Sequence, residues 1–181
     1  MEEDKQTATE ETESSEETTD KEEANADEAV AEADSDEEEA AEAEADEAEA
    51  ELEAAIEVEN DLRSEIVTYA LQFVGNRYKY GGTNPNTGVD CSGFTSYVMR
   101  HAAEVELPHS SGGQSRMGRQ VSSSEMRPGD IICYGSGKRI NHVALYIGNG
   151  QIVHASTERT GIKVSRWNYR TPVRIVNVLG D

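Results

Sequence analysis

The sequence holds only two cysteines among its 181 residues, so it carries no disulfide framework. It also lacks any run of 18 apolar residues, and no transmembrane helix is expected. Residues 1–4 are acidic apart from Met1. They offer neither the basic nor the apolar region of a signal peptide. These absences predict a protein that is cytoplasmic or is exported by a segment upstream of this sequence.

Glycine and proline are absent from residues 1–60, although the whole chain contains 15 and 4 of them. Residues 1–60 hold 28 acidic and 2 basic residues, a net charge of −26. Residues 61–181 hold 9 acidic and 14 basic residues, a net charge of +5. We therefore predict an acidic tail or linker over 1–60 and one domain over 61–181. About 120 residues suffice for one compact core.

The two halves of the acidic tail differ in composition. Residues 1–25 are rich in Glu, Thr and Ser, bury too little apolar surface to offset chain entropy, and are expected to be disordered. Residues 26–60 alternate Ala and Glu, which favour a helix, while like charges four residues apart oppose it. We expect a partial helix that becomes firmer toward Leu52 and Ile56. The tail is interpreted as a solubilising linker, with a charged tether as the alternative.

The pattern of residues 61–181 predicts an α+β domain. Helices are expected over 61–75, capped by Asn60 or Asp61, and over 91–103. Residues 104–126 are predicted to form a loop. Strands are expected over 131–134, 142–147, 151–155 and 173–178. This order predicts N-terminal helices packed on a central antiparallel sheet.

Cys91 stands at the predicted start of the second of these helices. Backbone N–H groups and the helix dipole stabilise a thiolate at such a position. Cys91 is therefore a candidate nucleophile, which requires a base and a group that orients the base. Cys133 lies within an apolar strand and is interpreted as a buried small hydrophobic residue.

His142 and His154 lie on the two arms of a predicted hairpin whose turn contains Gly148, Asn149 and Gly150. A two-residue turn would place the two imidazoles on opposite faces of the sheet. A three-residue turn would place them on one face, one diagonal step of about 7–8 Å apart. Because Gly150 suits the left-handed position of a three-residue turn, we predict a shared face.

A shared face predicts a Cys/His/His relay. Cys91 attacks a carbonyl carbon, His142 accepts the thiol proton, and His154 orients His142. The alternatives are ordinary strand histidines, or a zinc site formed by the same three residues. No metal is expected, because the spacing lacks the usual ligand pairs. His101, at the end of the second helix, is interpreted as structural.

Five segments in the right order resemble the NlpC-type cell-wall cysteine peptidases over about residues 62–179. They are YKYGG at 78–82, DCSGF at 90–94, RPGD at 127–130, NHVALYIG at 141–148 and IVHA at 152–155. The resemblance implies a papain-like fold and no cofactor. It also implies bacterial peptidoglycan stem peptides as partners, cleaved between γ-D-glutamate and the diamino acid.

The same resemblance assigns roles to individual residues. It implies Cys91 as nucleophile, His142 as base and His154 as third polar residue. It also places Tyr80, Asp90 and Ser92 at the cleft as substrate-binding residues, and Ser111 is a further substrate-binding candidate. One departure is His109, because many relatives have Arg at that place. Export to the cell wall or the extracellular space is implied, with a leader that lies upstream or has been removed.

Two alternatives to the endopeptidase remain open at this point. The same site supports an amidase or an acyltransferase, because the motifs do not distinguish water from an amine as second nucleophile. A non-catalytic wall-binding module is the alternative from another class. No loop has phosphate-site spacing and the basic residues are scattered, so no nucleic-acid binding is expected. A monomer is expected.

Overall fold

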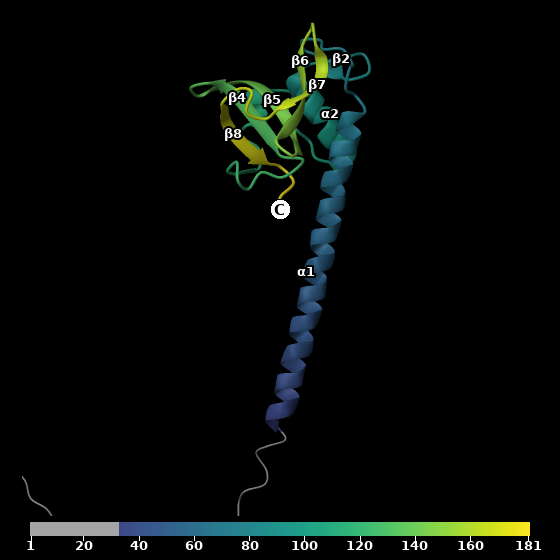
Figure 1. Ribbon diagram of the computed structural model, residues 1–181, viewed down its shortest axis with the longest axis vertical. Coiled ribbons are helices and arrows are strands. Elements are labelled where there is room, and N and C mark those ends of the chain that lie inside the picture. The colour runs from purple at the N-terminus through teal and green to yellow at the C-terminus, as the bar shows by residue number, and fades with distance from the viewer. Residues whose placement is uncertain (1–32) are drawn as a thin grey trace, which may run out of the picture. The chain divides into compact units, whose positions relative to one another are not determined.

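The computed structural model describes the backbone of residues 33–181 and the side chains from residue 47 onward (Figure 1). The expected disorder over 1–25 lies outside the described residues. One compact unit comprises Ala48–Asp181, and the charge boundary at residue 60 lies inside it. None of the helices in the described part of the chain combines the length and the apolar character that crossing a membrane requires.

Helix α1 runs without interruption from Ala33 to Leu71. The prediction that a new helix begins at Asn60 or Asp61 is therefore wrong. No glycine or proline occurs before Gly75, so nothing in the sequence stops the helix at residue 60.

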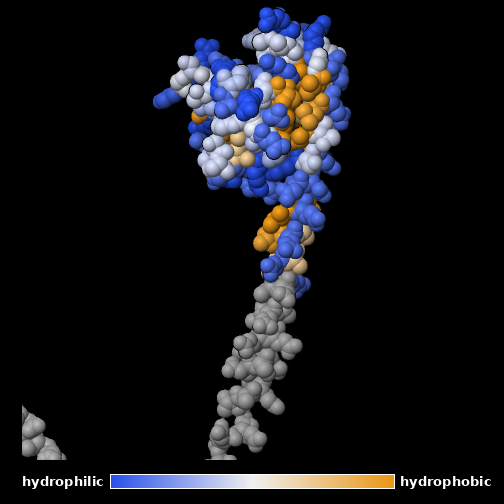
Figure 2. All heavy atoms as spheres, viewed as in Figure 1, coloured by the Kyte–Doolittle hydropathy of each residue, from blue (hydrophilic) through white to orange (hydrophobic). Residues whose placement is uncertain are grey.

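The surroundings of helix α1 differ along its length. Leu52, Ile56 and Val58 are exposed, and hydrophobic atoms are visible on α1 next to the undescribed part in Figure 2. Ile66 and Ala70, about two to five turns later, are fully buried in the core. Within Ala48–Asp181, tertiary packing therefore stabilises the C-terminal turns of α1 and not the turns around Leu52.

A six-stranded antiparallel sheet forms the centre of the domain, in the order β3-β8-β4-β5-β6-β7. Its strands are β3 (Arg119–Gln120), β4 (Ile131–Ser136), β5 (Arg139–Gly148), β6 (Gln151–Thr157), β7 (Gly161–Arg166) and β8 (Pro172–Asn177). Strands β4, β5, β6 and β8 agree with the predicted ones. Strand β7 was not predicted, although its residues alternate between apolar and polar.

Short elements lie where loops were expected. The polar turn before Cys91 forms the hairpin of β1 (Thr83–Asn84) and β2 (Gly88–Val89). The loop over 104–126 contains helix α3 (Ser111–Gln114) as well as β3. Gln114 is fully buried and its side-chain amide donates to the Ser92 carbonyl at 2.9 Å, which ties this loop to α2 (Cys91–Ala103).

The sheet carries a hydrophobic cluster on each face. Odd-numbered side chains of β4 and β5, such as Cys133 and Val143, pack in the larger cluster with Ile66 of α1 and Phe94 of α2. Even-numbered side chains, such as Tyr134 and Ala144, form the smaller cluster, with Trp167 packed against it. Cys133 is fully buried, which confirms its interpretation as a core residue.

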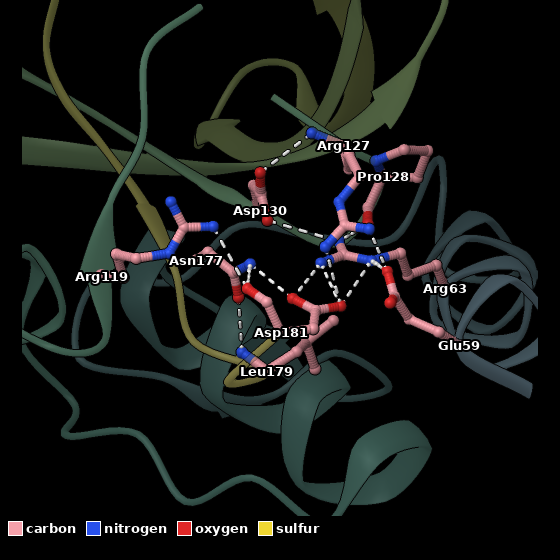
Figure 3. A network of polar contacts seen from close by, with 9 residues as sticks. All are labelled: Glu59, Arg63, Arg119, Arg127, Pro128, Asp130, Asn177, Leu179 and Asp181. Carbon is pink, nitrogen blue, oxygen red and sulfur yellow. Dashed lines mark hydrogen bonds and ion pairs between the residues drawn. The ribbon is translucent and has the colours of Figure 1, made fainter. Parts of the chain in front are cut away.

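Arg63 of α1 lies at the centre of a polar network (Figure 3). Only 3% of its surface is exposed. Its guanidinium donates to the Asp181 carboxylate at 2.7 and 2.8 Å, and to Asp130 at 3.3 Å. It also donates to the Pro128 carbonyl and to Glu59. This network joins α1 to the start of β4 and to the segment after β8, three parts of the chain that are distant in sequence.

Candidate active site

Helix α2 begins at Cys91, as predicted, because Asp90 caps it. The Asp90 carboxylate accepts from the Gly93 N–H at 2.8 Å and from the Gly81 N–H at 3.0 Å. A Cβ atom on Gly93 would lie 2.2 Å from the Gly82 carbonyl oxygen. Gly93 therefore allows the chain before the hairpin to lie directly against the first turn of α2.

The Cys91 sulfur faces strand β5 at Val143, the neighbour of His142. The Tyr146 N–H points toward β4, where it donates to the backbone carbonyl of Asp130. Successive N–H groups of a strand point to opposite sides, so the Val143 N–H, three residues earlier, points toward β6. The pairing of β5 with β6 ends at Leu145↔Val153, so β6 provides no backbone partner at Val143. Burial raises the pKa of the Cys91 thiol, and the N–H groups of Val143 and Ser92 oppose this rise. The sulfur thus occupies the gap where β5 and β6 separate.

The histidine pair has the predicted arrangement. His142 Nε2 lies 2.7 Å from His154 Nδ1, and the two side chains are 8% and 1% exposed. The hairpin, however, has a two-residue turn, because Gly148 pairs with Gln151 across Asn149 and Gly150. A bulge at Ile147 then restores the register in which Leu145 opposes Val153. The predicted shared face is therefore correct, and a bulge produces it in place of a longer turn.

Both imidazoles are held in the neutral form. Burial, and then the charge of Arg170, lowers the pKa of His142 to about 4. Burial, followed by the charges of His142 and Lys163, lowers the pKa of His154. Together with the raised pKa of Cys91, these shifts favour a neutral thiol beside a neutral imidazole. This differs from the thiolate–imidazolium pair that a helix N-terminus suggests.

The predicted substrate-binding residues have different surroundings. Tyr80 is 83% exposed, while Asp90 and Ser92 are buried and joined by a hydrogen bond of 3.3 Å. His109 Nε2 lies 2.8 Å from the Asp90 carboxylate, so this residue joins the start of α2. Ser111 lies at the start of α3. The structure brings together Asp90, Ser92 and His109, and it leaves Tyr80 open to solvent.

Three further residues lie near the histidine pair, and the sequence did not indicate them. The Ser165 hydroxyl lies 3.0 Å from His154 Nε2. The Tyr169 ring centroid lies 5.4 Å from that of His154. Arg170 donates to the Asn141 side chain at 3.0 Å and raises the local positive potential at His142. Ser165 belongs to the strand that was not predicted, and the other two lie in the turn that follows it.

No group of three or more His, Cys, Asp or Glu side chains within the described residues is arranged to hold a metal ion. His142 is bonded to His154, and the Cys91 sulfur faces Val143, the residue after His142. The site thus offers a half-buried sulfur at a helix N-terminus, a neutral imidazole on the strand that the sulfur faces, and a second imidazole bonded to the first. Such an arrangement can perform acyl transfer.

Comparison with known proteins identifies the family of this chain. A profile of the NlpC/P60 family matches residues 75–175. The protein named murein DD-endopeptidase MepS/murein LD-carboxypeptidase, from Escherichia coli strain K12, is 41% identical over 108 residues. The match covers 60% of this chain and 56% of that protein, so the chain spans about half the length of this curated relative.

Two solved structures are similar to this chain in fold. The NlpC/p60 domain of the peptidoglycan hydrolase SagA is 32% identical, with a TM-score of 0.59 over 64% of this chain and 97% of that domain. The peptidoglycan hydrolase RipB from Mycobacterium tuberculosis is 28% identical, with a TM-score of 0.60 over 67% of each chain. The expected α+β, papain-like fold is confirmed. The chain belongs to the NlpC/P60 family.

Proposed function

We propose that this protein is a cysteine endopeptidase that hydrolyses peptidoglycan stem peptides. The observation that carries the proposal is the hydrogen bond of 2.7 Å between His142 and His154, next to a half-buried cysteine at a helix N-terminus. Membership of the NlpC/P60 family and the name of the Escherichia coli relative support the substrate class. We infer that residues 61–181 act as the peptidase domain behind an acidic tail, in a bacterial protein exported to the cell wall.

The proposed reaction proceeds through a thioester. As the Cys91 sulfur attacks the scissile carbonyl carbon, its proton passes to Nδ1 of His142, since Nε2 is engaged by His154. The resulting imidazolium donates this proton to the leaving amine, which departs as the C–N bond breaks. A water molecule then loses a proton to His142 and attacks the thioester, and the proton returns to the Cys91 sulfur. Acid–base assistance of this kind contributes about 10²–10⁴ in rate.

Two bonds of the stem peptide are candidates. We propose the bond between γ-D-glutamate and the diamino acid, as the resemblance to the NlpC-type peptidases implies. The name of the Escherichia coli relative specifies a DD-endopeptidase and an LD-carboxypeptidase, and this favours a cross-link bond as the second candidate. The proposed binding residues are Tyr80, Asp90, Ser92 and Ser111. His109, bonded to Asp90, stands beside them.

Defined muropeptides analysed by mass spectrometry test the proposal. Cleavage at γ-D-glutamate leaves a disaccharide with two amino acids, whereas cleavage of a cross-link converts dimers into monomers. An amidase would release intact stem peptides, and an acyltransferase would require an added amine. Cys91→Ala and His142→Ala should abolish product formation, with His101→Gln as control. Equal product profiles for wild type and Cys91→Ala would contradict the peptidase and favour a wall-binding module.

A further inference from the structure

A serine terminates the row of hydrogen bonds that begins at His142. His142 Nε2 lies 2.7 Å from His154 Nδ1, and His154 Nε2 lies 3.0 Å from Ser165 Oγ. Strand β7 places this serine diagonally from His154, since His154 pairs with Lys163. Both ring nitrogens of His154 are therefore occupied. Of the four nitrogens in the two rings, only His142 Nδ1 is without a partner in this row.

A neutral imidazole has one N–H donor and one acceptor nitrogen, so the row can run in two directions. In the first, His142 Nε2–H donates to His154 Nδ1, and His154 Nε2–H donates to Ser165. In the second, Ser165 donates to His154 Nε2, and His154 Nδ1–H donates to His142 Nε2. The first direction leaves His142 Nδ1 unprotonated, and the second places a proton there. Only the first direction leaves a base that can accept a thiol proton.

We propose that Ser165 is a positioning residue whose oxygen accepts the His154 Nε2–H and thereby keeps His142 Nδ1 free to accept the Cys91 proton. A hydroxyl can accept this bond while its own hydrogen turns toward solvent, and Ser165 is half-buried. The role in catalysis rests on the proposed function. The role of Ser165 in setting the tautomers of the two rings is independent of the proposed function.

Proton counting supports the first direction. When His142 takes the thiol proton, both of its nitrogens carry hydrogen, so His154 Nδ1 must accept. His154 then carries its hydrogen on Nε2, and Ser165 must accept in turn. The first direction meets these conditions before and after the transfer, with no other proton moved. The second direction would require three hydrogens to change place first.

The charges around the two rings maintain the neutral state that the tautomers require. Arg170 faces His142 from the turn after β7, and Lys163 of β7 lies beside His154. The aromatic rings of Tyr134 and Tyr169 pack on the pair from β4 and from the same turn. Cys91 approaches from α2. Within the described residues, no carboxylate contributes to the pKa of either imidazole.

Long-range ¹⁵N–¹H correlation spectra of the imidazole rings, recorded at pH 7.5 on the full chain, test the tautomers directly. In wild type, both His142 and His154 should carry hydrogen on Nε2. Ser165→Ala should populate the other tautomer of His154, and Ser165→Thr, which keeps the hydroxyl, should restore the wild-type spectrum. The control Ser136→Ala, at the exposed end of β4, should leave both rings unchanged. Hydrogen on Nδ1 of His154 in wild type would overturn the proposal, as would an unchanged Ser165→Ala spectrum.

Rates on muropeptides give the second readout. Loss of one hydrogen bond of ordinary strength corresponds to a decrease in kcat of about threefold to tenfold for Ser165→Ala, with KM unchanged and with recovery in Ser165→Thr. A Ser165→Ala variant with full kcat would overturn the catalytic role. If wild type cleaves no muropeptide while the tautomers are as expected, the proposed function fails and the positioning role of Ser165 stands.

Discussion

His142 and His154 form a hydrogen bond of 2.7 Å across the gap where β5 and β6 separate. The bond requires the register produced by the bulge at Ile147, since a shift by one residue would turn one imidazole to the opposite face. It also requires at least one neutral ring, because one nitrogen must accept. Burial provides this condition, and the first prediction follows from it.

The free energy of unfolding should fall as the pH decreases from about 7 to 4. The pKa of His142 is lowered from its ordinary 6.5 to about 4, so in this window the unfolded chain binds a proton that the folded chain does not. The loss of stability for His142 alone is on the order of 2 kcal/mol at pH 5. Urea unfolding at pH 7.5 and pH 5 measures it.

His154→Gln provides the matched comparison for this pH dependence, since it removes one of the two neutral rings and should flatten the slope. Asp181, whose pKa is lowered, loses its stabilising effect at lower pH, and Asp130, whose pKa burial raises, acts with the opposite sign. Equal slopes for wild type and His154→Gln would show that the pair is not held neutral.

The rate at which iodoacetamide alkylates Cys91 should increase with pH in a single step. The midpoint of this step should lie above the pKa of a free cysteine thiol. Burial raises the pKa of this thiol, and the base beside it is neutral at rest. Mass spectrometry of the labelled protein over pH 5–10 gives the profile. Cys91→Ala should take up no label, because Cys133 is fully buried with a pKa raised to about 12. A reactive plateau at pH 6 would instead demonstrate a resting ion pair.

Arg170→Gln should raise the pKa of His142, because a positive charge beside the ring disfavours its protonated form. The acidic limb of the activity profile should consequently move to higher pH. An NMR titration of His142 measures the same shift without activity. Arg166→Gln, an exposed position on β7, is the control of equal charge change. Identical titrations of His142 in both variants would argue against a contribution from Arg170.

Arg63→Ala should lower the free energy of unfolding by about 3–5 kcal/mol, the usual cost of removing one partner from a buried ion pair. Arg63 is 3% exposed, and its loss leaves Asp130 buried without this partner. Chemical denaturation compares the variant with Arg159→Ala, which removes an exposed arginine in the turn before β7. A change within about 0.5 kcal/mol, typical of a surface substitution, would mean that the network in Figure 3 adds little stability.

Much of the site could be predicted from local sequence. The start of α2 was predicted at Cys91, and the structure shows the side-chain cap behind it, Asp90, which acts within three residues. Alternation along the hairpin limits His142 and His154 to two arrangements. The shared face was predicted from a three-residue turn, whereas a two-residue turn and the bulge at Ile147 produce it. The motifs around Cys91 then suffice to predict the family and the α+β fold.

Other features depend on contacts between distant parts of the chain. The bulge at Ile147 and the pairing of β6 with β7 are settled by packing across the sheet, so Ser165 and Arg170 could not be placed near the histidines from spacing alone. The contact between His109 and Asp90 likewise requires the loop to fold back on α2.

The sequence by itself determined Cys91, His142 and His154 as the candidates for the chemistry, because helix starts and strand alternation are local. Only the tertiary structure decided their protonation, because burial comes from elements far apart in the chain. It lowers the pKa of His142 and raises that of Cys91, and so makes the pair neutral at rest where the helix dipole alone suggests an ion pair.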